Sequence, residues 1–232
     1  MKHAILALVA GLVILAAPVV AQDNPIVVEL YTSQGCSSCP PADEILHELA
    51  DRDDVIALAL HVDYWDYIGW KDPFGDPDHA IRQREYAAAG NRRTIYTPEM
   101  VVQGTTDIVG ARPMQLSKAI ADHARVPSKI AIDLVRNGDT LTVAAQALEE
   151  LPRNMVIQVL RYTPRQTTKI KRGENRGRTL EYANVVDGLR EIGSWDGRAP
   201  LAISETIEGD QPVVVIVQQQ NAGPILAAAR LR

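Results

Sequence analysis

The spacing of apolar residues predicts alternating strands and helices in the first half of the chain. Residues 55–62 form a continuous apolar run of the kind found in buried parallel strands. Ile45, Leu46 and Leu49 instead recur at helical spacing. The pattern as a whole predicts strands at 26–31, 55–62, 99–103 and 106–109 and helices at 40–51, 78–89 and 113–125. This order, β-α-β-α-β-β-α, predicts a mixed sheet flanked by helices.

After residue 126 the pattern changes to that of antiparallel strands. Ile130, Ile132 and Leu134 alternate with polar residues, and a following Asn-Gly pair favours a hairpin turn. Further strands are expected at 155–162, 179–186, 201–207, 212–219 and 225–230. Short strands at this density are typical of a β-sandwich. The sequence therefore predicts an α/β domain at 25–125 followed by an all-β, sandwich-like domain at 127–232.

Residues 1–21 have the layout of a secretory signal peptide. A polar start with Lys2 precedes an apolar run at 4–17, and Pro18 and small residues up to Ala21 follow. The run is short for a membrane span, which needs about 20 apolar residues. We therefore expect an exported protein, periplasmic or secreted, with no stable membrane span after signal cleavage. The alternative is an uncleaved N-terminal anchor.

Composition and charge narrow the classes of function. With 46% hydrophobic and 23% charged residues the chain is an ordinary globular protein, which excludes disorder and collagen. The net charge of −5 argues against a nucleic-acid-binding protein, which usually carries a basic face. The chain has two cysteines, too few for a disulfide framework, and nothing in the sequence indicates a cofactor.

Cys36 and Cys39 form a Cys-x-x-Cys motif at the turn from a predicted strand into a predicted helix. The free N–H groups and the dipole of a helix N-terminus stabilise a thiolate, so we expect a lowered pKa for Cys36. The spacing lets Cys39 reach the sulfur of Cys36, so the two can form a disulfide. The motif predicts thiol–disulfide exchange in which Cys36 attacks a protein or small-thiol substrate and Cys39 resolves the mixed disulfide.

Two other interpretations of the cysteine pair stay open. In the first, the disulfide is structural and the protein is a non-enzymatic binding protein of the cell envelope. In the second, which is less favoured, the two thiolates hold Cu(I), a soft ion. Zinc would need further ligands, for which His61, His79 and Asp63 are the candidates, and we assign no metal site.

Two stretches of the first half resemble glutaredoxins. Residues 28–32, Val-Glu-Leu-Tyr-Thr, followed by the Cys-x-x-Cys, resemble their first strand and active-site turn, and residues 96–104 resemble their Thr-Val-Pro segment and following strand. The resemblance implies a thioredoxin-like α/β domain in which Pro98 is cis, faces the cysteines and belongs to the catalytic site. It implies that Thr97 offers its backbone to the substrate. It also makes Glu29 the nearest candidate for the buried acid that thioredoxins carry beneath the second cysteine.

A wider resemblance is to DUF1223, an exported family with a thioredoxin-like fold and no assigned reaction. It is carried by residues 29–43, 61–72 and 96–98 and spans most of the mature chain. The resemblance therefore implies a fold and an exported location, and it leaves the reaction open.

The block at residues 61–72 follows a predicted strand, at the sheet edge where α/β proteins gather ligands. We expect Trp65 to floor a substrate groove there and Asp63 to move protons at Cys39. The alternative is that Trp65 and Trp70 pack the loop against the second domain.

Residues 161–178 carry seven Lys and Arg residues against the single acid Glu174. The segment is either a solvated hairpin tip or a surface for an anionic partner or membrane.

Overall fold

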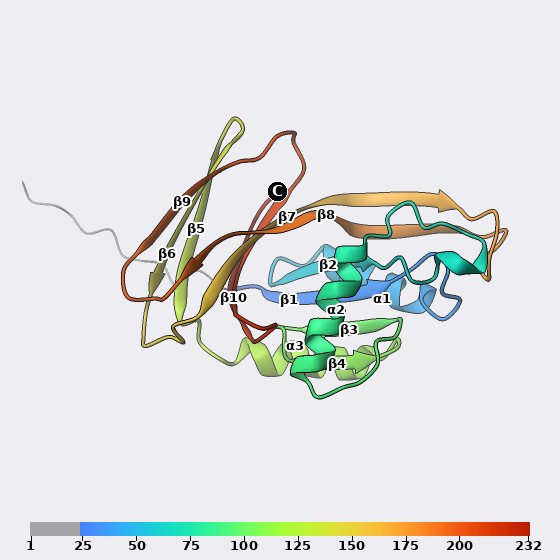
Figure 1. Ribbon diagram of the computed structural model, residues 1–232, viewed down its shortest axis with the longest axis horizontal. Coiled ribbons are helices and arrows are strands. Elements are labelled where there is room, and N and C mark those ends of the chain that lie inside the picture. The colour runs from blue at the N-terminus through green and yellow to red at the C-terminus, as the bar shows by residue number, and fades with distance from the viewer. Residues whose placement is uncertain (1–23) are drawn as a thin grey trace, which may run out of the picture.

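The computed structural model describes residues 24–232, and the expected signal peptide at 1–21 lies outside them (Figure 1). Within the described residues the chain forms eleven strands, three α-helices and one short 3₁₀ helix. The strands are β1 (Ile26–Thr32), β2 (Val55–His61), β3 (Glu99–Val102), β4 (Thr106–Val109), β5 (Ile130–Asn137), β6 (Thr140–Ala147), β7 (Met155–Lys169), β8 (Thr179–Trp195), β9 (Leu201–Thr206), β10 (Val213–Gln219) and β11 (Ile225–Leu231). The helices are α1 (Pro40–Ala50), η1 (Asp66–Ile68), α2 (Pro77–Ala89) and α3 (Pro113–Ala124). Among residues 24–232 no helix combines the length and the hydrophobicity that a membrane span requires.

Prolines mark where the three α-helices begin. Pro40, Pro77 and Pro113 each stand in a first helical turn, where the missing N–H group is not needed for a helical hydrogen bond. Asp76 caps α2, because its carboxylate accepts a hydrogen bond from a first-turn N–H group. The predicted order β-α-β-α-β-β-α is confirmed for residues 26–124.

The fold class that the sequence predicted, a thioredoxin-like α/β domain followed by a β-sandwich, is wrong. Strands from both halves of the chain form one mixed eight-stranded sheet in the order β11-β10-β7-β8-β2-β1-β3-β4. The halves join where β8 runs parallel to β2, with Val185 opposite Ala59. A separate three-stranded sheet has the order β5-β6-β9. The described chain is therefore mostly β, built on one large sheet that both halves supply.

The long β7–β8 hairpin accounts for much of this difference. Its strands have 15 and 17 residues, whereas apolar alternation predicted only 155–162 and 179–186. The outer part of β7 consists of Thr, Gln, Arg and Lys side chains with little burial. A strand without a buried face shows no apolar alternation, so its full length has no hydrophobic signature. Figure 1 shows the hairpin reaching along the molecule to end beside η1.

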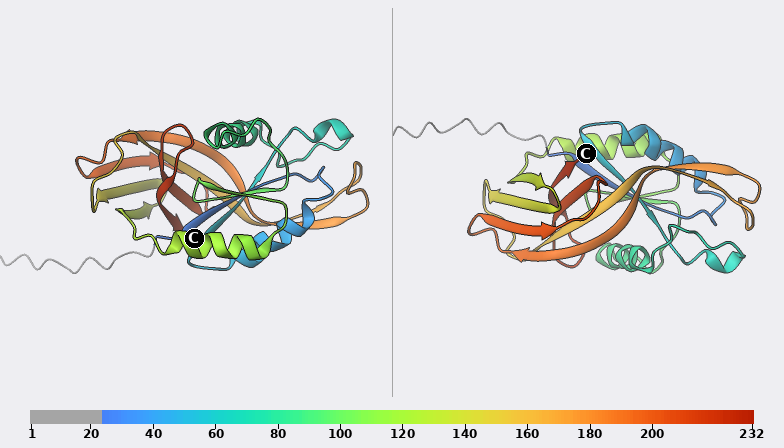
Figure 2. Two further views of the ribbon diagram at one scale, coloured as in Figure 1. Left: turned by 90° about the horizontal axis from the view of Figure 1, so that it is seen from below. Right: turned by 90° about the horizontal axis from the view of Figure 1, so that it is seen from above.

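Three apolar cores hold the layers together (Figure 2). α1 and α3 cover one face of the β1–β4 part of the large sheet. α2 covers the opposite face, where Leu58 of β2 shares a core with Leu160 and Ile216 of β7 and β10. The three-stranded sheet packs on the C-terminal strands around a third core, which contains Trp195. The two halves of the chain therefore share apolar surface as well as a sheet.

A buried arginine on α2 links strands from both halves. Arg82 donates to both carboxylate oxygens of Glu29 on β1, at 2.7 and 3.3 Å. It also donates to the side-chain oxygens of Gln158 on β7 at 3.2 Å and Gln218 on β10 at 3.1 Å. The hydroxyl of Tyr86 donates to Glu29 at 2.7 Å. The buried carboxylate of Glu29 is thus paired with a cation and bonded to a hydroxyl, as an enclosed charge requires.

Candidate functional site

Cys36 and Cys39 form a disulfide at the turn from β1 into α1. Cys39 is the N-cap of α1, and its carbonyl accepts the N–H of Asp43 at 3.1 Å. The predicted place of the pair at a helix N-terminus is therefore confirmed. The two cysteines are buried, with exposed fractions of 1% and 0%, whereas Ser37 and Ser38 between them are exposed. No feature of the sequence predicted this burial.

The loop after β2 brings the predicted site residues Trp65 and Thr97 together. The Nε1 of Trp65 donates to the Oγ1 of Thr97 at 2.7 Å, and the Thr97–Pro98 peptide bond is cis, as expected. Trp65 also lies against Gly35, where an added Cβ would come within 2.8 Å of the Trp65 Cβ. Tyr67 stacks on Trp65 with ring centroids 6.3 Å apart and is 81% exposed. Trp65 therefore connects the cysteine turn to the Thr97–Pro98 segment and to an exposed aromatic ring.

The carboxyl group of Asp43 is buried one turn along α1 from Cys39. The Oγ1 of Thr32 donates to its Oδ1 at 2.8 Å. Burial raises the pKa of Asp43 to about 7, and the charge of His61 and the Thr32 hydroxyl limit the rise. Glu29, which we expected to be the nearest buried acid, belongs to the ion pair on the α2 side of the sheet. Asp43 is therefore the buried acid on the side of the sheet that carries the cysteine helix.

His61 and Asp72 form a second buried polar pair. The Nδ1 of His61 donates to the Oδ2 of Asp72 at 2.8 Å, and the same oxygen accepts the backbone N–H of Gln34 at 2.8 Å. Burial by itself would raise the pKa of Asp72, but His61 and the backbone N–H groups hold it below its usual value. Tyr182 of β8 packs edge-on against His61, with centroids 4.8 Å apart. His61 is thus a hydrogen-bonded core histidine, and Asp72 anchors the backbone just before the cysteines.

Asp63, the predicted proton carrier, lies at the start of the loop after β2. Its backbone carbonyl accepts the N–H of Asp66 at 3.0 Å. Among residues 24–232 its carboxylate takes part in no hydrogen bond or salt bridge, and its side chain is partly exposed. In the same part of the chain, no three His, Cys, Asp or Glu residues are grouped so that they could hold a metal ion.

The end of the β7–β8 hairpin covers the cysteine turn. We call residues 169–178 the hairpin tip. Asn175 of the tip is 1% exposed, and its Nδ2 donates to the carbonyl oxygens of Gln34 and Cys36, both at 2.9 Å. The Nε2 of Gln34 donates to the Oγ1 of Thr168 at 3.1 Å. The hairpin is therefore hydrogen-bonded to the backbone on both sides of Gly35.

Further contacts fix the hairpin tip on the loop after β2. The carboxylate of Glu174 accepts the backbone N–H of Ser37 at 3.2 Å. Gly173 has a positive φ of 74° and lies against Ile68 and Trp70, where an added Cβ would come within 3.2 and 3.3 Å of side-chain atoms. Only glycine meets both demands easily. The sequence distinguishes this segment by its charge, but nothing in the sequence indicates which surface the segment contacts.

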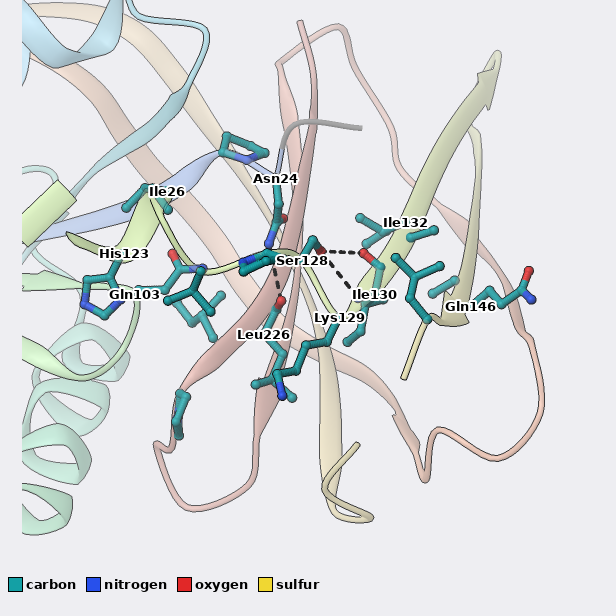
Figure 3. A pocket seen from close by; sticks show the side chains of 18 of the residues that line it. Asn24, Ile26, Gln103, His123, Ser128, Lys129, Ile130, Ile132, Gln146 and Leu226 are labelled. Atoms are coloured by element: carbon teal, nitrogen blue, oxygen red, sulfur yellow. Dashed lines mark hydrogen bonds between the residues drawn. The ribbon is translucent and has the colours of Figure 1, made fainter. Parts of the chain in front are cut away.

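A large cavity of about 1070 Å³ lies away from the cysteines (Figure 3). It borders the beginning of β1 at Ile26, whereas the cysteines follow the end of that strand. Figure 3 shows Ile130 and Leu226 among its apolar side chains and Lys129 beside them. No cysteine lines this cavity, so it takes no part in thiol chemistry.

Solved structures similar to this chain include one with nearly the same extent. The crystal structure of protein AGR_C_4864 from Agrobacterium tumefaciens has a TM-score of 0.77 and 29% sequence identity, over 89% of this chain and 93% of that chain. Hypothetical protein PH1083 from Pyrococcus horikoshii OT3 has a TM-score of 0.23 and 13% identity, over 44% of this chain and 87% of that chain. A superoxide reductase in the oxidized state has a TM-score of 0.23 and 12% identity, over 45% and 88%. The last two similarities are too low to support an argument.

Comparison with protein-family models identifies the family of this chain. A search among curated proteins gives no match. The family model described as "Protein of unknown function (DUF1223)" matches residues 27–218. Since the match spans well over half of the chain and includes the cysteine turn, the Trp65 loop and the hairpin tip, the protein belongs to the DUF1223 family.

Proposed function

We propose that the protein is an exported thiol–disulfide oxidoreductase, periplasmic or secreted, that acts through the Cys36–Cys39 pair. The observation that carries this proposal is a disulfide at the N-terminus of α1 with the protonatable carboxyl of Asp43 one helical turn away. A helix N-terminus favours a thiolate, and a carboxyl with a pKa near 7 exchanges protons readily at neutral pH.

Cys36 is the residue that meets the substrate. A substrate thiolate attacks the Sγ of Cys36, the Cys36–Cys39 bond breaks, and a substrate–Cys36 disulfide forms. Cys39 leaves as a thiolate and takes a proton from Asp43. In the reverse direction, the Cys39 thiolate attacks Cys36 and releases the substrate thiolate. Ser37 and Ser38 between the cysteines are exposed, and the Oγ of Ser38 lies 3.3 Å from the Sγ of Cys36.

Trp65 and Thr97 provide the surface for the substrate chain beside the cysteines. The hydrogen bond between them holds the Trp65 ring in place, and Pro98 shapes the backbone next to Thr97. We assign proton transfer to Asp43 in preference to Asp63, because Asp43 is buried one helical turn from Cys39 and burial raises its pKa to about 7.

Burial of the pair sets a condition on this chemistry. Because Cys36 is 1% exposed, an incoming thiolate reaches its sulfur only after the hairpin tip has moved. The same burial favours a second candidate function, in which the disulfide is structural and the protein is a non-enzymatic binding protein of the envelope.

A glutathione redox titration distinguishes the two functions. We expect a midpoint in the range of exchange proteins, about −120 to −270 mV, whereas a structural disulfide resists reduction below about −300 mV. The Cys39→Ser variant should retain substrates as mixed disulfides on Cys36, and the Cys36→Ser/Cys39→Ser variant is the control. A midpoint below that limit together with no trapped species would assign the structural function instead.

A further inference from the structure

The hairpin tip is strongly basic. It holds five cationic residues and one carboxylate in ten positions, a net charge of +4, in a chain whose net charge is −5. The cations, all exposed, are Lys169, Lys171, Arg172, Arg176 and Arg178. Within residues 24–232 none of them forms a salt bridge, and only the Arg178 side chain makes a hydrogen bond, to the Oδ1 of Asn175 at 3.1 Å. This exposed cluster creates a positive potential that is available to an anionic partner.

The one acid of the tip does not neutralise these cations. Glu174 directs its carboxylate to the N–H of Ser37, inside the Cys-x-x-Cys motif. The basic cluster therefore stands directly over the cysteine turn. Figure 1 shows η1 at the same end of the molecule.

We propose that the hairpin tip is the docking surface for an acidic polypeptide. The inference rests on the proposed function, because it names the partner of the same cysteine pair. Charge complementarity selects an anionic partner. The spread of five exposed cations over ten residues fits a polypeptide segment with several carboxylates better than a small thiol with one or two.

Docking also explains how the buried pair is reached. A partner carboxylate accepts the Ser37 N–H in place of Glu174, and this releases one of the bonds that hold the tip on the cysteine turn. The partner thiolate then attacks the Sγ of Cys36, the bond to Cys39 breaks, and a partner–Cys36 disulfide forms. Cys39 leaves as a thiolate and is protonated, so the disulfide of this protein is the only oxidant that the step needs.

The test measures binding of a fluorescent acidic peptide to the full mature chain. Its single central Ser stands between Glu residues, so binding is measured without exchange. We expect binding that weakens with added salt, and a loss of affinity of about tenfold or more in the Lys171→Glu/Arg172→Glu variant. The matched control, Arg125→Glu/Arg153→Glu, reverses two exposed cations far from the cysteines and should bind like wild type.

Three results would overturn the proposal. They are equal binding of a peptide with Lys in place of Glu, no effect of reversing the tip charges, and binding to phosphatidylglycerol vesicles without binding to the acidic peptide. A Cys version of the peptide separates this proposal from the proposed function. If the Cys peptide binds at the tip and forms no mixed disulfide, docking is supported and exchange fails. If it exchanges at equal rates with wild type and the tip variant, exchange is supported and docking fails.

Discussion

Asp43 is a carboxyl group enclosed among Thr32, His61 and the first turns of α1. Burial penalises its charged form, so the group titrates near neutral pH in the folded chain and near its ordinary value in the unfolded chain. The folded state therefore binds the proton more tightly. Stability contributed by this proton is complete at low pH and is lost as the pH rises through the folded pKa of about 7.

The Asp43→Asn variant should therefore be more stable than wild type in the oxidised state at about pH 8, by about 2–4 kcal/mol. The amide keeps an acceptor for Thr32 and carries no charge. Below about pH 3 the two proteins should have equal stability, because Asp43 is then protonated when folded and unfolded. Urea denaturation at both pH values measures the difference. A gap that does not change with pH would show that Asp43 is not the titrating group.

The sequence contained a signal for Asp43 that the fold was needed to interpret. Asp43 follows Cys39 by four residues and shares the buried stripe of α1 with Leu46, but an acid at such a position is usually an exposed edge residue. Glu29 was the more obvious candidate because it stands within an apolar strand. Which face of the sheet each acid takes depends on the pairing of β1, which residue types alone do not determine.

Glu29 is the second buried carboxylate, and substitution of its partner Arg82 measures how much the ion pair matters for stability. Arg82→Met should lower the free energy of unfolding by about 3–5 kcal/mol, because Glu29 is then left buried without its cation. The double variant Glu29→Gln/Arg82→Met should recover part of that loss. Urea denaturation measures both. A double variant less stable than Arg82→Met would mean that the pair itself, and not the orphaned charge, governs the effect.

At the scale of elements, the β7–β8 hairpin both completes the large sheet and covers the cysteine turn, and the sequence predicted only the sheet strands. Its inner half pairs with β2 and β10 in the large sheet, and its outer half extends to the cysteine turn. Within residues 26–124, α1 and α3 were predictable because each buries one apolar stripe, and β2 was predictable because it is a continuous apolar run that is buried throughout. The outer part of β7 buries little of either face, so it shows no period.

Removing the Asn175 side chain should loosen this cover. Asn175→Ala loses two hydrogen bonds to the cysteine turn, so we expect reduction of the disulfide by dithiothreitol to become about tenfold faster. The measurement is the rate of thiol release in the folded protein.

Asn184 provides the matched control for this variant. Asn184 lies on β8 and, like Asn175, is a buried asparagine. Its Nδ2 donates to the carbonyl oxygen of Ala57 at 2.8 Å, away from the cysteines. Asn184→Ala should lower global stability without a comparable gain in the reduction rate. Equal acceleration in both variants would mean that reduction follows global unfolding and that the hairpin tip does not control access.

At the scale of the whole molecule, a sheet and a core shared by both halves favour a single cooperative unit. Leu58 packs with Leu160 and Ile216, and α2 bonds to strands from both halves. The parallel contact of β2 with β8 is short, with one register pair, and joins residues more than a hundred positions apart. Such a pairing has no local signature, so the sequence suggested two domains where the strands continue as one sheet.

Unfolding should therefore be a single transition. The chain has three tryptophans, so a variant that keeps only Trp65 reports on the cysteine end and one that keeps only Trp195 reports on the third core. In each variant we expect the fluorescence and circular dichroism midpoints in urea to coincide. Separate midpoints in the Trp195 variant would show that residues 127–232 unfold on their own.

Asn175 and Cys36 are in contact although 139 residues of sequence separate them. During synthesis of the chain, Asn175 is therefore added well after Cys36. A chain made from its N-terminus presents both cysteines long before the segment that will enclose them. At about 5–20 residues per second the delay is on the order of ten seconds. During that interval an external oxidant has unhindered access to the pair, which it loses once the hairpin closes. A catalyst that is too large to reach the enclosed disulfide of the finished protein can thus still oxidise the two cysteines of the newly made chain.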